Sequence, residues 1–155
     1  MTTLTEGKKA PIFKGLDQNG NKVSLADFKG KKVILYFYPK DDTPGCTAQS
    51  CNLRDNYTDL LKKGFAVIGI SADDVKSHKK FETKYGLPFP LIADEDQTIV
   101  NQYSVWGEKN FMGKTYMGIV RTTFLIDEAG KIKKIINKPD TKNHTEEILA
   151  AWEEA

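Results

Sequence analysis

The stretch that decides the fold is Val33-Ile-Leu-Tyr-Phe-Tyr38, followed by Pro39-Lys-Asp-Asp-Thr-Pro-Gly-Cys46. Its first six residues form a continuous apolar and aromatic run, which is typical of a strand buried on both faces of a sheet. Pro39 ends this run, and a polar loop follows. Thr43-Pro44 then has the pattern of a helix N-cap followed by proline at the first helical position. The stretch therefore predicts a buried strand that leads through a short loop into a helix.

Strand and helix patterns alternate on both sides of this stretch, without a linker or an internal repeat. Ile12–Leu16 and Lys22–Leu25 flank an Asn-Gly pair and predict a hairpin, because Asn-Gly readily adopts the positive φ angles of a tight turn. The helix that begins at Pro44 is expected to reach Lys63, just before Gly64. The other expected elements are strand 65–71, helix 73–85, strand 90–93, helix 98–104, a long loop at Trp106–Gly118, a hairpin of 122–127 with 131–136, and helix 145–153.

This order of elements predicts an α/β fold of the thioredoxin-like type, a three-layer sandwich in which helices flank a mixed central β-sheet, with an N-terminal β-hairpin. A chain of 155 residues has the size of a single domain, so residues 1–155 are expected to form one. The fold class alone does not define a function.

The composition is that of an ordinary globular protein and excludes several classes of function. A net charge of +2 and scattered lysines argue against a nucleic-acid binder, and the longest apolar run is far too short to cross a membrane. The first residues lack the apolar segment of a secretory signal. We therefore expect a cytoplasmic protein, in which a pair of cysteines is more often catalytic, redox-active or metal-binding than a structural disulfide.

Cys46 has the sequence position of a reactive cysteine. If Thr43 caps the helix, Cys46 is its third residue, where unpaired backbone N–H groups and the helix dipole favour a negative charge. The thiolate is the nucleophilic form of cysteine, and helix N-termini and nearby cations favour it. An inert buried cysteine is the alternative, but a polar loop with two prolines and a glycine argues against burial in the core.

Cys51 follows five residues after Cys46, which differs from the Cys-x-x-Cys spacing of disulfide exchangers. In an intact helix this spacing gives about 7.5 Å of rise and roughly 140° of rotation. The two Cα atoms would then lie beyond the roughly 7 Å limit for a disulfide, so a Cys46–Cys51 bond requires the first helical turns to unwind. A half-buried helix residue without a redox role is the alternative for Cys51.

Pro39-x-x-x-Thr43-x-x-Cys46 resembles the signature of the peroxiredoxins. Gly45-Cys46-Thr47 with Cys51 and Arg54-Asp55 is similar to their Q subgroup, also called bacterioferritin comigratory proteins, and Arg121–Asp127 resembles a second block of that family. The resemblance covers Lys9 to Trp152. It implies a peroxidase that reduces hydrogen peroxide and organic hydroperoxides, uses thioredoxin or a thioredoxin-like protein as its reductant, and is monomeric. No exposed apolar stripe is evident that would contradict a monomer.

The resemblance also implies a role for each matching residue. Cys46 corresponds to the peroxidatic cysteine and Cys51 to the resolving one. Thr43 corresponds to the hydroxyl that binds the peroxide, Pro39 to the residue that shields the thiolate, and Arg121 to the cation that activates it. The segment Asn137–His144 has no clear match in the family, so docking of the reductant is not assigned to it.

Each of these residues also has a purely structural interpretation. Thr43 can act only as a helix cap, Pro39 can simply end a strand, and Arg121 can form a surface ion pair. For His78 packing on a helix face is the default, and for His144 capping or simple exposure is favoured over catalysis.

Other functions fit the sequence less well. Two cysteines and two distant histidines do not supply the ligands of a zinc site, and we expect neither a metal nor a cofactor. A cysteine hydrolase needs a histidine base with an orienting partner, for which neither His78 nor His144 is placed. A thioredoxin-like disulfide exchanger lacks its cysteine spacing, and Arg121-Thr122-Thr123 stands where thioredoxins have a proline. A non-enzymatic redox sensor would use the same thiol but turn over peroxide slowly.

Overall fold

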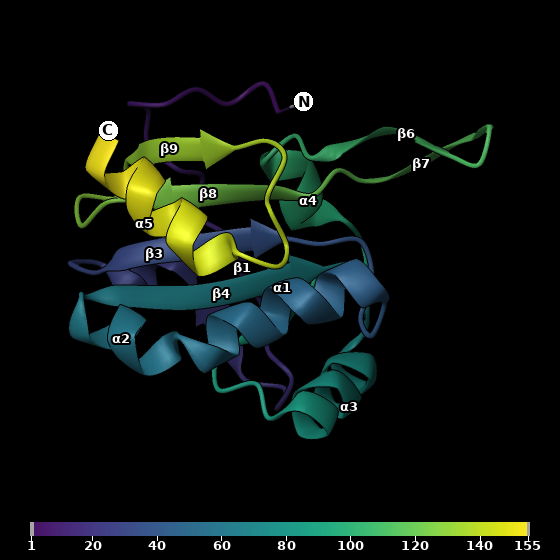
Figure 1. Ribbon diagram of the computed structural model, residues 1–155, viewed down its shortest axis with the longest axis horizontal. Helices are drawn as coiled ribbons and strands as arrows, with labels where there is room; N and C mark the ends of the chain where they lie inside the picture. The colour runs from purple at the N-terminus through teal and green to yellow at the C-terminus, as the bar shows by residue number, and fades with distance from the viewer. Residues whose placement is uncertain (1, 155) are drawn as a thin grey trace.

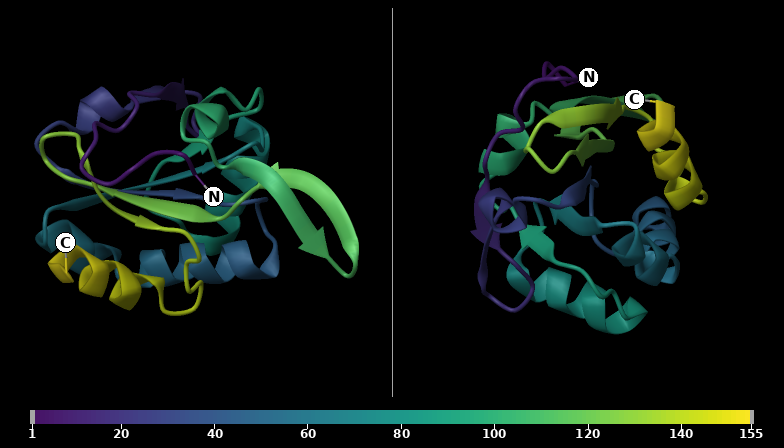
Figure 2. Two further views of the ribbon diagram at one scale, coloured as in Figure 1. Left: turned by 90° about the horizontal axis from the view of Figure 1, so that it is seen from above. Right: turned by 90° about the vertical axis from the view of Figure 1, so that its left-hand side faces the viewer.

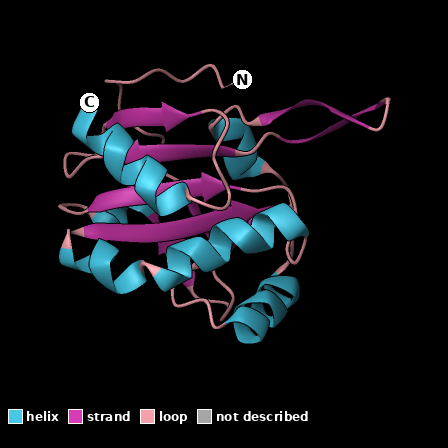
Figure 3. Cartoon of the chain, in the orientation of Figure 1, coloured by secondary structure: helices cyan, strands magenta, loops and turns pink. Residues whose placement is uncertain are grey.

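The structure, a computed structural model, describes residues 2–154 and has helices packed around a seven-stranded mixed sheet (Figures 1 and 3). In chain order its elements are β1 (Lys14–Leu16), β2 (Lys22–Ser24), the 3-10 helix η1 (Leu25–Phe28), β3 (Lys32–Phe37), α1 (Pro44–Asp55), α2 (Tyr57–Lys62), β4 (Phe65–Ser71), α3 (Val75–Tyr85), β5 (Leu91–Ala93), α4 (Thr98–Gln102), β6 (Trp106–Phe111), β7 (Lys114–Ile119), β8 (Thr122–Ile126), β9 (Ile132–Ile136) and α5 (His144–Glu154). The expected thioredoxin-like fold, including the N-terminal hairpin β1–β2, is confirmed.

The sheet has the strand order β2-β1-β5-β4-β3-β8-β9, which puts the predicted buried strand β3 near its centre. β3 pairs in parallel with β4 and antiparallel with β8. In the antiparallel pair, Phe37 at the end of β3 lies opposite Thr122 at the start of β8. The residue before Thr122 therefore reaches the sheet edge at which the loop after β3 begins.

Side chains that alternate along β3 divide the core into two halves, because successive strand residues point to opposite faces of a sheet. Ile34 and Tyr36 belong to a cluster with residues of α1, α2, α3 and α5. Leu35 and Phe37 belong to a second cluster with residues of α4, η1 and the N-terminal segment. The two further views show the larger group of helices on one side of the sheet (Figure 2). Burial on both faces explains why this strand reads as one apolar run.

The prediction of a long loop at Trp106–Gly118 is wrong, because this segment forms most of a two-stranded hairpin, β6–β7. The hairpin extends away from the body of the protein (Figure 2, left). Met112 and Gly113 form its turn and both have positive φ angles, which suits a tight hairpin turn. Solvent reaches both faces of the outer part, so its sequence needs no alternation of polar and apolar residues. At the tip of the hairpin, Phe111 and Met112 are 66% and 87% exposed.

The single helix expected from Pro44 to Lys63 is interrupted at Asn56. The side chain of Asn56 donates to the carbonyl oxygen of Asn52 over 2.8 Å, a local bond by which asparagine competes with helical backbone pairing. The part that carries both cysteines, α1, is therefore a separate helix of 12 residues. Within residues 2–154, no helix is both long and apolar enough to span a bilayer.

Candidate active site

Cys46 lies in the first turn of α1, as the sequence predicts. Thr43 has the extended backbone of an N-cap, and its carbonyl accepts the first helical bond, from the N–H of Thr47, over 2.8 Å. The expected side-chain cap is absent, because the Thr43 hydroxyl donates to the carbonyl of Lys40 over 2.8 Å. The first amide groups of a helix have no partner within it. The positive end of α1 is therefore directed at the surroundings of Cys46.

The expectation that Cys46 avoids the core is wrong, since its exposed fraction is 0%. It belongs to the cluster on the α1 face of the sheet, together with Tyr36 and Leu53. The polar loop before Cys46 is a poor guide to burial, because polar residues of this loop can be buried too. Asp41, for example, is buried and hydrogen-bonded to neighbouring elements. The sulfur is thus largely removed from water.

Arg121 contacts this sulfur although it lies 75 residues further along the chain. It immediately precedes β8, and its Nη2 donates to Sγ of Cys46 over 3.3 Å. Its Nη1 donates to Oε1 of Gln49 over 2.7 Å, so one guanidinium group contacts two residues of α1. An Arg121 that only forms a surface ion pair does not fit these contacts.

Two further residues shape this contact and were not predicted from the sequence. Gln49 is completely buried one helical turn after Cys46, on the same face of α1. Gly45 lies so close to Arg121 that an added Cβ would be 3.1 Å from Nη2. The i, i+3 spacing from Cys46 was the available signal for Gln49, whereas the need for Gly45 depends on the tertiary position of Arg121.

The buried sulfur lies between a helix N-terminus and a guanidinium group, and both neighbours are electropositive. The same donors can also stabilise negative charge on an atom that the sulfur attacks. The arrangement suits a cysteine nucleophile. The rings of His78 and His144 form their hydrogen bonds with other groups and not with this sulfur.

The chain is similar to known proteins along most of its length. The sequence pattern of the AhpC/TSA family matches residues 6–135. The putative peroxiredoxin bcp of Coxiella burnetii is 53% identical over 147 residues, covering 95% of this chain and 97% of the relative. Peroxiredoxin Bcp of Escherichia coli is 49% identical over 149 residues and covers 96% of each chain.

The chain belongs to the AhpC/TSA family. It is a peroxiredoxin of the Q, or bacterioferritin comigratory protein, subgroup, and thus a peroxidase among the oxidoreductases. Its structure resembles that of a cysteine-to-serine mutant of Xylella fastidiosa PrxQ, with a TM-score of 0.90 and 28% identity, covering 97% and 96% of the two chains. A structure from work on the alkyl peroxide reduction activity of the Xanthomonas campestris bacterioferritin comigratory protein has a TM-score of 0.87 and 32% identity, covering 97% and 98%.

Cys51 of this peroxiredoxin lies five residues after Cys46, about 1.4 turns along the intact helix α1. Both cysteines are free thiols. Cys51 is half-buried. Burial raises the pKa of its thiol, and the nearby Arg54 partly offsets this effect. In this folded form Cys51 is therefore held as a neutral thiol, which is a poor nucleophile.

Lys109 on β6 is a further cation near the site that the sequence did not predict. Its Nζ donates to the carbonyl of Ile119, at the base of the hairpin, over 2.9 Å. Burial lowers the pKa of Lys109, the charge of Arg121 lowers it further, and Cys46 acts in the opposite direction. The base of the β6–β7 hairpin therefore borders the surroundings of Cys46.

The remaining candidates lie as follows. Pro39 is half-buried just after β3, as expected for a residue that ends a strand. The expectation that His144 is a cap or is exposed is wrong, because the ring is buried between Thr123 on β8 and Glu147 on α5. His78 is buried as expected, but among polar groups as well as apolar ones. Asn137–His144 leads into α5, and Lys142 in this segment accepts a hydrogen bond from Asn52 on α1.

Proposed function

We propose that the chain acts as a single-domain, monomeric peroxidase of the cytoplasm, with Cys46 as the peroxidatic cysteine and Cys51 as the resolving one. The Cys46 thiolate attacks the outer oxygen of hydrogen peroxide or an organic hydroperoxide. The S–O bond forms as the O–O bond breaks, which leaves a sulfenic acid on Cys46. The other peroxide oxygen departs as hydroxide or alkoxide and takes up a proton from solvent to become water or an alcohol.

The observation that carries this proposal is the 3.3 Å contact between Nη2 of Arg121 and Sγ of Cys46. A guanidinium stays charged at any working pH and offers several donors. One donor can hold the thiolate while the transition state spreads negative charge from sulfur onto the peroxide oxygens. In this scheme the Thr43 hydroxyl binds the peroxide and Pro39 shields the thiolate.

The second step joins the two cysteines. The Cys51 sulfur attacks the Cys46 sulfenic acid, so a disulfide forms and water leaves. α1 must unwind for this step, and unwinding also removes Cys51 from the surroundings that raise its pKa. A dithiol protein of the thioredoxin type then reduces the disulfide and becomes oxidised itself. The relatives named peroxiredoxin support this cycle.

A coupled assay with peroxide, thioredoxin, thioredoxin reductase and NADPH tests the proposal. We expect the native protein to turn over repeatedly with excess thioredoxin and Cys46→Ser to show background consumption, because an alcohol cannot replace the thiolate. Turnover by Cys46→Ser above background would refute the role of Cys46. A single slow oxidation of the native protein, without turnover, would favour a redox sensor.

A further inference from the structure

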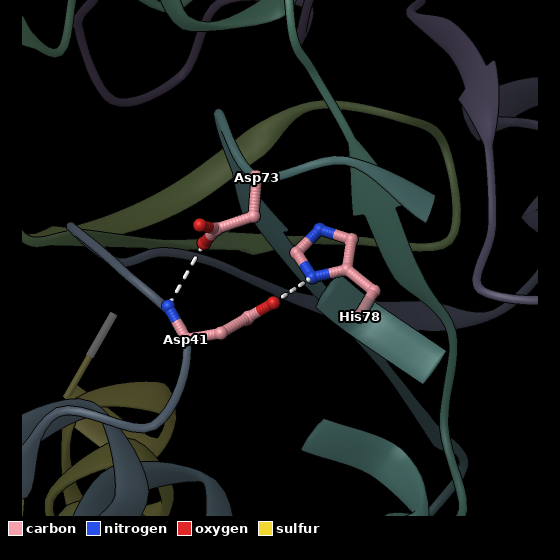
Figure 4. A group of neighbouring side chains, drawn as sticks. All are labelled: Asp41, Asp73 and His78. Carbon is pink, nitrogen blue, oxygen red and sulfur yellow. Dashed lines mark hydrogen bonds and ion pairs between the residues drawn. The ribbon is translucent and has the colours of Figure 1, made fainter. Parts of the chain in front are cut away.

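A buried polar cluster lies behind the loop that precedes Cys46, and the proposed cycle does not use it (Figure 4). Asp41 enters it from the loop, Asp73 from the segment between β4 and α3, and His78 from α3. The His78 side chain is fully buried, and that of Asp41 is 4% exposed. Charged groups are seldom buried to this extent without a reason, because removing them from water is costly.

The cluster has the composition of a metal site, but its hydrogen bonds argue against one. Oδ2 of Asp73 already accepts the backbone N–H of Asp41 over 2.8 Å and the hydroxyl of Ser71 over 2.6 Å. A cation between Asp41 and Asp73 would face that N–H group. Nε2 of His78 is directed instead to the carbonyl oxygen of Ile92, 2.9 Å away. Hydrogen bonds therefore account for the cluster.

The same contacts fix the protons of the His78 ring. A carbonyl oxygen can only accept, so Nε2 of His78 carries a hydrogen. Nδ1 lies 2.7 Å from Oδ2 of Asp41, and two acceptors cannot approach this closely without a proton between them. One proton therefore lies between the ring and the Asp41 carboxyl group, and this hydrogen bond joins α3 to the loop.

Further donors complete the surroundings of the Asp41 carboxylate. Ser77 on α3 donates to Oδ2 over 2.8 Å, and Tyr38 at the end of β3 donates to Oδ1 over 2.6 Å. Burial raises the pKa of Tyr38, so its hydroxyl keeps the proton that it donates. One side chain of the loop is therefore held by a strand and a helix at once.

We propose that His78 is a positioning residue for Cys46: by holding the Asp41 carboxylate, it fixes the loop 39–43 and with it the first turn of α1. The inference rests on the proposed role of Cys46. Only Asp42 and Thr43 separate Asp41 from Pro44, and Thr43 is itself bonded back to Lys40. A shift of Asp41 therefore moves the start of α1.

A second connection runs from the same carboxylate to α1. The ring of Tyr38 stacks on that of Tyr36, with centroids 5.4 Å apart, and the Tyr36 hydroxyl is hydrogen-bonded to Ser50 over 2.9 Å. Ser50 lies one turn after Cys46 on α1. The position of the helix therefore depends on the cluster both through the loop and through two stacked tyrosines.

Stopped-flow measurement of the rate constant between Cys46 and hydrogen peroxide tests the inference. His78→Leu fills a similar volume with an apolar side chain and removes both hydrogen bonds of the ring. We expect the rate constant to fall about 10- to 100-fold, which is the effect of a misplaced reacting group. Lys84→Gln is the matched control, because Lys84 also joins α3 to this loop, at Asp42, but through an exposed ion pair. We expect a change of about twofold or less for this control.

A second pair of variants separates positioning from folding. In Asp41→Asn the amide can donate to Nδ1 of a neutral His78 ring while its oxygen accepts from Tyr38, so we expect the rate constant to stay within about threefold of the native value. Asp41→Ala keeps neither bond, so its rate constant should fall as much as that of His78→Leu. Thermal unfolding is recorded for each protein, so that rate constants are compared only between folded samples.

Equal rate constants in folded His78→Leu, Asp41→Ala and native protein would overturn the inference, even if the unfolding temperatures differ. A native rate constant that falls with a chelator and returns with zinc would also overturn it, in favour of a metal site. Native protein that consumes no peroxide would instead refute the proposed function.

Discussion

The guanidinium of Arg121 contributes two separable properties to the site, a charge and a planar set of donors. Arg121→Met loses both, and we expect the peroxide rate constant to fall about 100-fold or more, as when a donor to developing negative charge is removed. Arg121→Lys keeps the charge but cannot hold Cys46 and Gln49 together, so a smaller loss is expected. Stopped-flow rate constants and thiolate absorbance against pH measure both effects.

Arg121→Met also leaves the buried Gln49 without its partner, at a cost to stability of about 1–3 kcal/mol. The double variant Arg121→Met/Gln49→Leu controls for this cost. It should regain part of the stability and none of the rate. An unchanged rate constant and thiolate titration in Arg121→Met would show that the contact with the sulfur has no catalytic effect.

Cys51→Ser separates the two steps of the proposed cycle. The first step should remain, because the guanidinium of Arg121 bonds to Cys46 and Gln49 and not to the thiol of Cys51. Cys46 should then stop at the sulfenic acid, and excess peroxide should convert it to sulfinic acid. Mass spectrometry after one and after several equivalents of peroxide detects these species. Steady-state turnover with thioredoxin as fast as in the native protein would mean that Cys51 is not the resolving residue.

At the level of the elements, α1 must change most during the cycle, and its hydrogen bonds indicate where the change ends. Asn52 joins the helix to the start of α5, since its Oδ1 accepts from the N–H and from the hydroxyl of Thr145 over 2.8 and 2.7 Å. We therefore expect unwinding between Thr43 and Cys51, with the last turn of α1 retained. Faster amide hydrogen exchange at residues 47–51 in the disulfide form measures this.

The amides of α3 provide the internal reference for that exchange experiment, because α3 carries neither cysteine. Equal protection of residues 47–51 in both redox states would contradict a disulfide within one chain. Loss of protection that extends through Asp55 would show that the bonds of Asn52 do not limit the unwinding.

The elements that could be predicted from the sequence are those whose pattern follows from local burial. β3 reads as one apolar run because both its faces are covered, and the Thr-Pro pair marks the start of α1. The β6–β7 hairpin could not be predicted, since solvent on both faces of its outer part removes any alternation. Gln49 and the Asp41–His78 pair were missed for a different reason: their partners lie 72 and 37 residues away.

For the whole molecule, the buried ring of His144 links stability to pH. Nδ1 faces the carboxylate of Glu147, and Nε2 lies 2.9 Å from the Thr123 hydroxyl, which can donate to it, so the neutral ring satisfies both contacts. Burial lowers the pKa of His144 below its ordinary value of 6.5, although Glu147 acts in the opposite direction. The ring joins α5 to β8 and therefore couples its protonation to the packing of the C-terminal helix.

The sign of the effect follows from where the proton binds. Below pH 6.5 the unfolded chain takes up a proton at His144 that the folded protein resists, so the free energy of unfolding falls as the pH decreases toward the folded-state pKa. The slope from this residue is at most about 1.4 kcal/mol per pH unit. Urea unfolding at about pH 7.5 and about pH 5 measures the loss. In His144→Gln, whose amide can replace both hydrogen bonds but does not titrate, the loss should be smaller by this contribution, whereas an identical loss in both proteins would show that His144 is not its source.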